Sequence, residues 1–97
     1  GESRKGSRMT SYHLNIASPE GSIYNGPAVQ LSVRGIEGDL AILAGHIPFL
    51  TVLKEGECRV YVTEDDVREA ICTGGMLSVG NDGKVQLLSS GFKWKRK

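Results

Sequence analysis

The stretch MLSVGNDGKVQLL, residues 76–88, decides the fold class of this chain. Apolar and polar residues alternate on both sides of Asn81-Asp82-Gly83, and turn residues of this kind between two alternating runs are typical of a β-hairpin. The pattern therefore predicts that residues 76–79 pair with residues 84–88 as antiparallel strands.

A second hairpin is predicted upstream, between residues 58–63 and residues 67–72. A register in which Thr63 faces Val67 places Cys58 opposite Cys72 and brings the small and apolar side chains to one face. That predicted core face consists of Cys58, Val60, Ala70 and Cys72, and Arg59, Tyr61 and Glu69 are expected on the other side. A slip by one residue would mix the two sets, so the faces should be well specified.

Most of the remaining chain also alternates with period two, and turn residues interrupt it every 8–12 residues. Extended segments are predicted over residues 12–17, 22–24, 29–34, 40–43 and 49–53. The segment 22–24 is expected to stop at Asn25-Gly26-Pro27, and the apolar run 40–43 is expected to be short or buried on both sides. No window carries the i, i+3, i+4, i+7 stripe of a helix. An all-β sandwich or barrel is predicted.

The length of 97 residues allows one domain with a thin core. Residues 1–8, which precede Met9, are expected to be a leftover of cloning. We expect the domain proper to span residues 9–90 and a basic tail to span residues 91–97. The leader and the cations of the tail carry net charges of +2 and +4, which leaves −5 for residues 9–92. An acidic body argues against a nucleic-acid surface, and no apolar run is long enough to cross a bilayer.

Candidate catalytic groups are sparse. His13 alternates outward on a predicted strand, and His46 lies in a Gly-His-Ile-Pro loop with Glu37 and Asp39 nearby in sequence. One histidine and two carboxylates without fixed spacing are a weak metal signal. Cys58 and Cys72 have no metal or redox spacing and are expected to be buried and reduced. Catalysis, a metal site and a cofactor are therefore not expected.

Two charged segments have a functional interpretation beside a plain one. The loop Gly35-Ile36-Glu37-Gly38-Asp39 is either a turn with solvated acids or an acidic tip that meets a basic partner, since paired carboxylates accept a guanidinium well. The tail KWKRK at residues 93–97 is either a solvated end or a contact segment. Trp94 is unusual inside such a charge run, and it could fold back or touch a partner or membrane surface.

Four stretches together resemble one protein family. They are YHLNIASPE at residues 12–20, GIEGDLAILAGHIPFL at 35–50, KEGECRV at 54–60 and TGGMLSV at 73–79. In order and spacing they resemble the epsilon subunit of the F-type, proton-translocating ATP synthase, called delta in mitochondria, from Tyr12 to about Leu88. Ala41 and Ala44 depart from the glycine and proline that are usual in the second stretch.

The resemblance implies a ten-stranded, two-sheet β-sandwich that is followed in the family by a two-helix C-terminal domain. It implies a non-catalytic subunit of the central stalk that bridges the gamma subunit and the polar loops of the c-ring and couples proton flow to ATP synthesis. The implied c-ring contacts are Glu37, Gly38, Asp39 and, on a neighbouring loop, His46. The gamma-facing residues stay unassigned. The implied location is the cytoplasmic face of a bacterial inner membrane, as a peripheral protein, with the chloroplast thylakoid as the other setting.

The short C-terminal end departs most from the family pattern. Residues 89–97 cannot form two helices, so the chain is either a truncated piece or a naturally short member of the family. We expect the short form, and in either case this chain should lack the inhibitory helical domain and nucleotide binding. Three other classes stay open: a generic interaction β-sandwich, a nucleic-acid-binding module that uses the basic tail, and a small metal-dependent enzyme.

Overall fold

The computed structural model describes residues 10–45 and 47–95, which form ten strands and no helix. The strands are β1 (Tyr12–Ser18), β2 (Gly21–Ala28), β3 (Gln30–Gly35), β4 (Gly38–Leu43), β5 (Phe49–Leu53), β6 (Gly56–Tyr61), β7 (Val67–Cys72), β8 (Gly75–Val79), β9 (Val85–Ser89) and β10 (Phe92–Trp94). The described part of the chain accordingly holds no helix that could cross a membrane.

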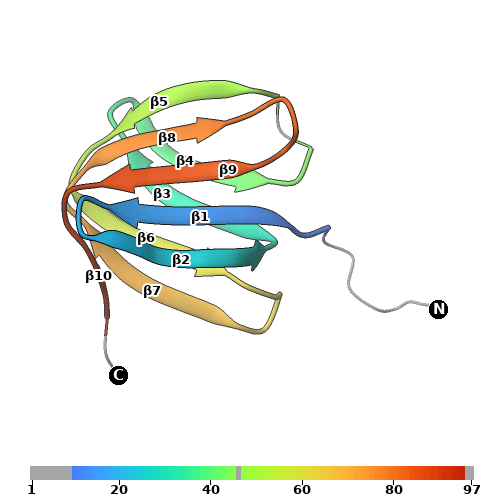
Figure 1. Ribbon diagram of the computed structural model, residues 1–97, viewed down its shortest axis with the longest axis horizontal. Coiled ribbons are helices and arrows are strands. Elements are labelled where there is room, and N and C mark those ends of the chain that lie inside the picture. Colours follow the sequence, from blue (N-terminus) through green and yellow to red (C-terminus); the bar gives the residue numbers. More distant parts are fainter. Residues whose placement is uncertain (1–9, 46, 96–97) are drawn as a thin grey trace.

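The strands follow one hydrogen-bonded path, β10-β7-β6-β3-β5-β8-β9-β1-β2, and β4 pairs with β3 beside this path. The path folds over into two layers of five strands, β2-β1-β9-β8-β5 and β10-β7-β6-β3-β4, as Figure 1 shows. The layers join where Gly35 pairs with Leu53, and two further backbone bonds flank that pair. The predicted ten-stranded, two-layer sandwich is therefore confirmed.

The core lies between the layers and follows the period-two alternation of the strands. The largest side chains that are fully buried there come from six strands of both layers: Leu14, Ile16, Leu31, Ile42, Cys58, Val60, Leu77 and Leu87. Leu14 and Ile16 of β1 sit beside β9 in the only parallel pairing among the described strands. Folding removes the apolar surface of all these side chains from water, and their close packing specifies how the two layers fit against each other.

The two predicted hairpins form, and one of them has a different register. Val79 pairs with Val85 around the 81–83 turn, which confirms the prediction there. In the other hairpin Tyr61 pairs with Val67 and Cys58 pairs with Ala70, so the predicted pairing of Cys58 with Cys72 is wrong by two residues. The hydroxyl of Thr63 accepts backbone N–H groups inside a longer turn instead of occupying a ladder position. A shift by two leaves every side chain on its face, so the predicted core face is still the buried one.

Two predicted segments differ in extent or burial. The segment 22–24 does not stop at Asn25, because β2 continues through Pro27 to Ala28. β2 ends the strand path, and an edge strand tolerates a proline that donates no hydrogen bond. The run 40–43 lies in β4, where only Ile42 is buried and Leu43 is 40% exposed. Of the two expectations for the run 40–43, the short strand is therefore correct and burial on both sides is wrong.

The sheet also extends past the boundary that we predicted at residue 90. Phe92–Trp94 form β10, which pairs with β7, so part of the expected tail belongs to the sandwich. Phe92 is buried in the core while Lys93 faces outward, and this is the alternation of a half-buried strand. The alternation of aromatic and basic residues over 92–95 was the signal for it in the sequence.

Candidate partner-binding surfaces

The acidic segment forms the tip of the β3–β4 hairpin. Gly35 pairs with Gly38, so only Ile36 and Glu37 lie in the turn, and Gly38 and Asp39 already belong to β4. The structure therefore brings Glu37, Gly38 and Asp39 together at one tip, and all three are exposed. The expected five-residue loop is in fact a tight hairpin end.

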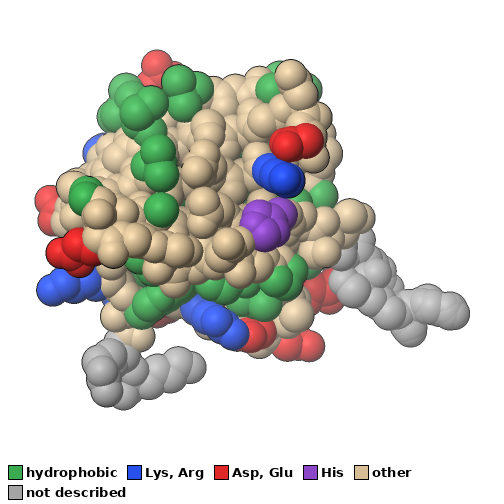
Figure 2. All heavy atoms as spheres, viewed as in Figure 1, with side chains coloured by type: hydrophobic (Ala, Val, Ile, Leu, Met, Phe, Trp, Pro, Cys, Tyr) green, Lys and Arg blue, Asp and Glu red, His purple; other side chains and the backbone are tan. Residues whose placement is uncertain are grey.

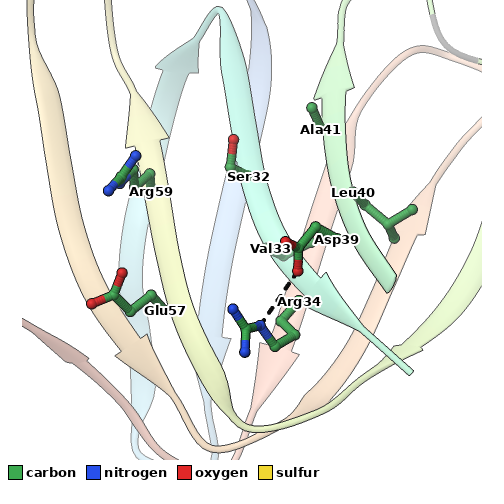
Figure 3. Close-up of a pocket in the computed structure, with 8 residues that line it drawn as sticks. All are labelled: Ser32, Val33, Arg34, Asp39, Leu40, Ala41, Glu57 and Arg59. Carbon is green, nitrogen blue, oxygen red and sulfur yellow. Dashed lines mark ion pairs between the residues drawn. The ribbon is translucent and has the colours of Figure 1, made fainter. Parts of the chain in front are cut away.

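Asp39 has a partner within its own chain. Its Oδ1 atom lies 3.3 Å from Nε of Arg34, which is the residue opposite it in the β3–β4 ladder, as the dashed line in Figure 3 marks. The Asp39 side chain is nevertheless 77% exposed, so the carboxylate can still meet a second cation. An exposed pair of this kind contributes little to stability, and it mainly orients the two groups.

The loop between β4 and β5 lies away from this tip. Residues 44–48 follow the last residue of β4, whereas Glu37 precedes the first, so the two loops lie at opposite ends of a six-residue strand, roughly 20 Å apart. They are neighbours in sequence and not in space. His46 itself lies outside the described residues, and Ile47 beside it is 75% exposed.

The outer face of the β2-β1-β9-β8-β5 layer carries an apolar patch. Val52 pairs with Met76, Met76 pairs with Leu88, and Leu88 pairs with Ala17, so one row of apolar side chains crosses four strands. Val52, Met76 and Leu88 are 43–47% exposed, and Leu50 next to the row is 63% exposed. We call Leu50, Val52, Met76 and Leu88 the apolar face. Figure 2 shows hydrophobic side chains gathered in this part of the molecule.

The apolar face reaches the hairpin tip at one end and a hollow at the other. The N–H of Ile36 donates to the carbonyl oxygen of Val52, so the exposed Ile36 extends the face to the acidic tip. At the other end, Met76 and Leu88 line a mostly apolar hollow of about 410 Å³ together with Pro19. Exposed apolar area that is contiguous in this way marks an interaction surface.

Sequence reasoning missed the apolar face. The run FLTVL of β5 is apolar except for Thr51, and only the register with β8 shows that Leu50 and Val52 point outward. The neighbouring pair Leu87-Leu88 in β9 was a weak signal, because one of two consecutive apolar strand residues must face away from the core.

The described residues give no support to a catalytic centre. They contain no group of three potential metal ligands. Cys58 and Cys72 are free and buried, as predicted, and desolvation, with a smaller effect from Cys72, raises the pKa of the Cys58 thiol to about 12. A protonated thiol in the core is a poor nucleophile. His13, which was expected to face outward, is exposed and borders a polar hollow with Asp82 and Lys84.

An all-β domain with one acidic tip and one exposed apolar face belongs to the class of interaction domains. The family profile of the ATP synthase delta/epsilon chain β-sandwich domain matches residues 11–95. Because that match covers most of the chain, the chain belongs to this family, as the sequence resemblance indicated.

Relatives in the curated collections carry the name ATP synthase epsilon chain. The chain is 41% identical to the protein of Nitrosomonas europaea over 86 residues, which are 89% of this chain and 61% of the relative. It is 43% identical to the Chromohalobacter salexigens protein over 74 residues, which are 76% of this chain and 52% of the relative. The chain thus spans about half to three fifths of these relatives. The Micrococcus luteus protein differs in this respect, since the match of 39% identity over 77 residues covers 85% of it.

Solved structures share the fold. A chain in the mitochondrial ATP synthase of Euglena gracilis superposes with a TM-score of 0.81 at 20% identity, over 97% of this chain and 60% of that chain. A chain from the central stalk and c-ring structure of Tetrahymena thermophila gives a TM-score of 0.72 at 15% identity, over 89% of this chain and 68% of that one. At such low identity these likenesses establish the sandwich architecture.

Proposed function

We propose that this domain is a non-catalytic part of the rotor of an F-type ATP synthase, where it links the gamma subunit to the c-ring and couples ring rotation to ATP synthesis. The observation that carries the proposal is the adjacency of two chemically different exposed surfaces, the acidic hairpin tip and the apolar face, which meet at Ile36 and Val52. A connector needs two such surfaces on a rigid body, and a folded-over sheet with a continuous hydrogen-bonded path is rigid.

The gamma subunit is proposed to pack on the apolar face. A permanent partner buries apolar area, and Leu50, Val52, Met76 and Leu88 supply it on neighbouring strands. The Tetrahymena structure that shares the fold comes from a central stalk and c-ring assembly, and by analogy it supports a place for this domain in the central stalk.

The c-ring is proposed to meet Glu37, Gly38 and Asp39. These residues project from the end of one hairpin, and a carboxylate there can accept a guanidinium or ammonium from a polar loop. Charged contacts of this kind set register and specificity more than affinity. His46, which lies outside the described residues, stays in the proposal as a further c-ring contact.

One further part of the proposal concerns the location of the whole subunit. We place it as a peripheral protein at the cytoplasmic face of a bacterial inner membrane, which agrees with the bacterial sources of its relatives.

The decisive experiment is capture of the cognate gamma subunit by this chain. We expect stoichiometric capture by the unchanged chain and loss of capture by Met76→Glu/Leu88→Glu, since two buried carboxylates would lack partners. His13→Glu/Asn25→Glu places the same charges on exposed positions of β1 and β2 in the same layer, outside the apolar face, and is the matched control. Failure of the unchanged chain to bind gamma would favour the generic interaction domain. RNA binding that falls steeply with salt would favour the nucleic-acid module.

A further inference from the structure

The outer face of the second layer carries a polar hollow, of whose lining residues the proposed function uses only Asp39. The hollow measures about 380 Å³ and opens over β3, β4 and β6, as Figure 3 shows. Its lining residues are Ser32, Val33, Arg34, Asp39, Leu40, Ala41, Glu57 and Arg59.

Two arginines offer unused hydrogen-bond donors there. Arg34 pairs with Asp39 through Nε, and Arg59 pairs with Glu69 through Nε at 3.3 Å. Each guanidinium has five N–H donors, and within the described residues neither pair engages the terminal amino groups. Both side chains are 49% exposed, so these amino groups are accessible.

Ser32 adds a third donor on the same sheet face as the two arginines. It faces Arg59 in the β3–β6 ladder and lies two residues before Arg34 on the same face of β3. Its Oγ atom already accepts a hydrogen bond from Nε2 of Gln30 at 3.1 Å. The hydroxyl proton is therefore left to donate into the hollow.

The close approach of Arg34 to β6 depends on Gly56. A Cβ atom at Gly56 would lie 2.9 Å from Cδ of Arg34, so the aliphatic part of the arginine lies across the strand where no side chain stands. This carries the Arg34 guanidinium from β3 toward the strand that bears Glu57 and Arg59.

The carboxylate of Glu57 could itself bind the two arginines, but it is hydrogen-bonded to Lys95 instead. Nζ of Lys95, from the end of β10, lies 2.5 Å from Oε2 of Glu57. This hydrogen bond, more than any other cause, lowers the pKa of the Glu57 carboxyl, with smaller effects from the charges of Lys95, Arg59 and Arg34. Glu57 therefore lies within electrostatic range of both arginines while its carboxylate is bound to the lysine.

We propose that this hollow binds a carboxylate side chain from an acidic segment of a partner protein, held by Arg34, Arg59 and Ser32. Planar guanidinium groups match the geometry of a carboxylate. The nearby acids Asp39, Glu57 and Glu69 each pair with one cation, and their charges disfavour a phosphate dianion more than a singly charged carboxylate. The flat, polar surroundings of the hollow on a sheet face suit a protein surface. Lys95 acts as a positioning residue, because it keeps Glu57 from taking the site.

The test is a titration of the full chain, with NMR detection of the Nε–Hε resonances of the arginines. The probes are the blocked tripeptide Asp-Glu-Asp, its amide counterpart Asn-Gln-Asn, and inorganic phosphate. We expect saturable shifts at Arg34 and Arg59 with the acidic peptide, and at least tenfold weaker binding of the amide peptide and of phosphate. Arg59→Gln and Arg59→Lys should both weaken binding at least tenfold. Glutamine removes the charge, and lysine keeps the charge but lacks the planar guanidinium that donates two parallel hydrogen bonds.

Variants of the Glu57–Lys95 pair test the positioning role. Glu57→Gln should tighten binding severalfold, Lys95→Ala should weaken it, and the double variant should bind as Glu57→Gln does. Arg68→Gln is the matched control, because Arg68 pairs with Asp66 outside the hollow, and it should leave binding unchanged. Absence of saturable shifts, equal binding of the amide peptide, or tighter binding of phosphate would overturn the proposal. Because these variants leave Glu37 and the apolar face intact, the outcome is independent of the gamma and c-ring tests.

Discussion

Trp94 lies edge-on against Tyr24, with ring centroids 6.3 Å apart and an interplanar angle of 73°. Tyr24 belongs to β2 and Trp94 to β10, which are the two ends of the strand path. Trp94 also packs edge-on against Phe92, which is buried in the core. This aromatic contact therefore closes the side of the sandwich that backbone hydrogen bonds leave open.

The first prediction follows from that closure. Trp94→Ala should lower the free energy of unfolding by about 1–3 kcal/mol, because it removes half-buried aromatic area and two edge-to-face contacts. Urea unfolding followed by circular dichroism measures the change. Lys93→Ala in the same strand should stay within about 0.5 kcal/mol of the unchanged chain, since Lys93 is exposed. Equal stability of both variants would show that the contact does not close the sandwich.

The second prediction concerns the acidic tip. Glu37→Lys/Asp39→Lys should reduce ATP-driven proton pumping in reassembled enzyme, because like charges would then meet at the proposed c-ring contact. Glu20→Lys/Asp65→Lys makes the same change in net charge at other exposed sites and should leave pumping intact. Unchanged proton pumping in Glu37→Lys/Asp39→Lys would contradict the assignment of this tip to the c-ring.

The third prediction tests a close approach between β8 and β9. A Cβ atom at Gly75 would lie 1.9 Å from the carbonyl oxygen of Leu88, and the backbone φ of Gly75 is +154°. Gly75→Ala should destabilise the fold by about 2–6 kcal/mol, since overpacking and backbone strain each contribute about 1–3 kcal/mol. Gly83 has φ +83° and open space around it, so Gly83→Ala should cost only about 1 kcal/mol. If Gly75→Ala and Gly83→Ala unfold at the same urea concentration, the steric argument is wrong.

The fourth prediction concerns alkaline stability. Burial raises the pKa of Cys58 to about 12 in the folded chain, above an unfolded value of about 8.5. The folded state thus binds a proton that the unfolded state releases, and this stabilisation is complete below the unfolded pKa and declines as the pH rises toward 12. The slope contributed by one such group is at most about 1.4 kcal/mol per pH unit.

Replacement of Cys58 by alanine should therefore flatten the fall in unfolding free energy between about pH 8.5 and 10. Above that range Tyr12 adds to the fall, because burial also raises its pKa and its hydroxyl donates to the carbonyl of Ile42 at 2.7 Å. A slope in the lower range that is the same with and without Cys58 would refute the assignment to this thiol.

Local pattern predicted the hairpins and the core faces well, because side chains in a strand alternate regardless of its partner. Cys58 and Ala70 are buried although their predicted pairing was shifted by two, since a shift of two residues preserves the face. The exact register depended on Thr63, whose hydroxyl accepts bonds inside the turn, and composition alone does not reveal that role.

The candidate surfaces were only partly predictable. The acidic tip was visible as a run of glycines and acids, and Glu37, Gly38 and Asp39 do lie together. The ion pair of Asp39 with Arg34 and the separation of the tip from the loop after β4 depend on strand length and pairing. The apolar face was invisible, because Val52, Met76 and Leu88 come from three strands that meet only in the folded sheet.

By itself, then, the sequence determined an all-β chain, its hairpins, its family and the side chains that alternate into the core. These features arise from neighbours within a few residues, where steric preference and turn chemistry act. Only the tertiary structure decided which apolar residues stay outside, how Arg34 and Arg59 come to share a hollow, and how Trp94 reaches Tyr24 across 70 positions of the chain. Those relationships exist because one sheet folds over on itself, and the long-range pairing that does this is not encoded in any local pattern.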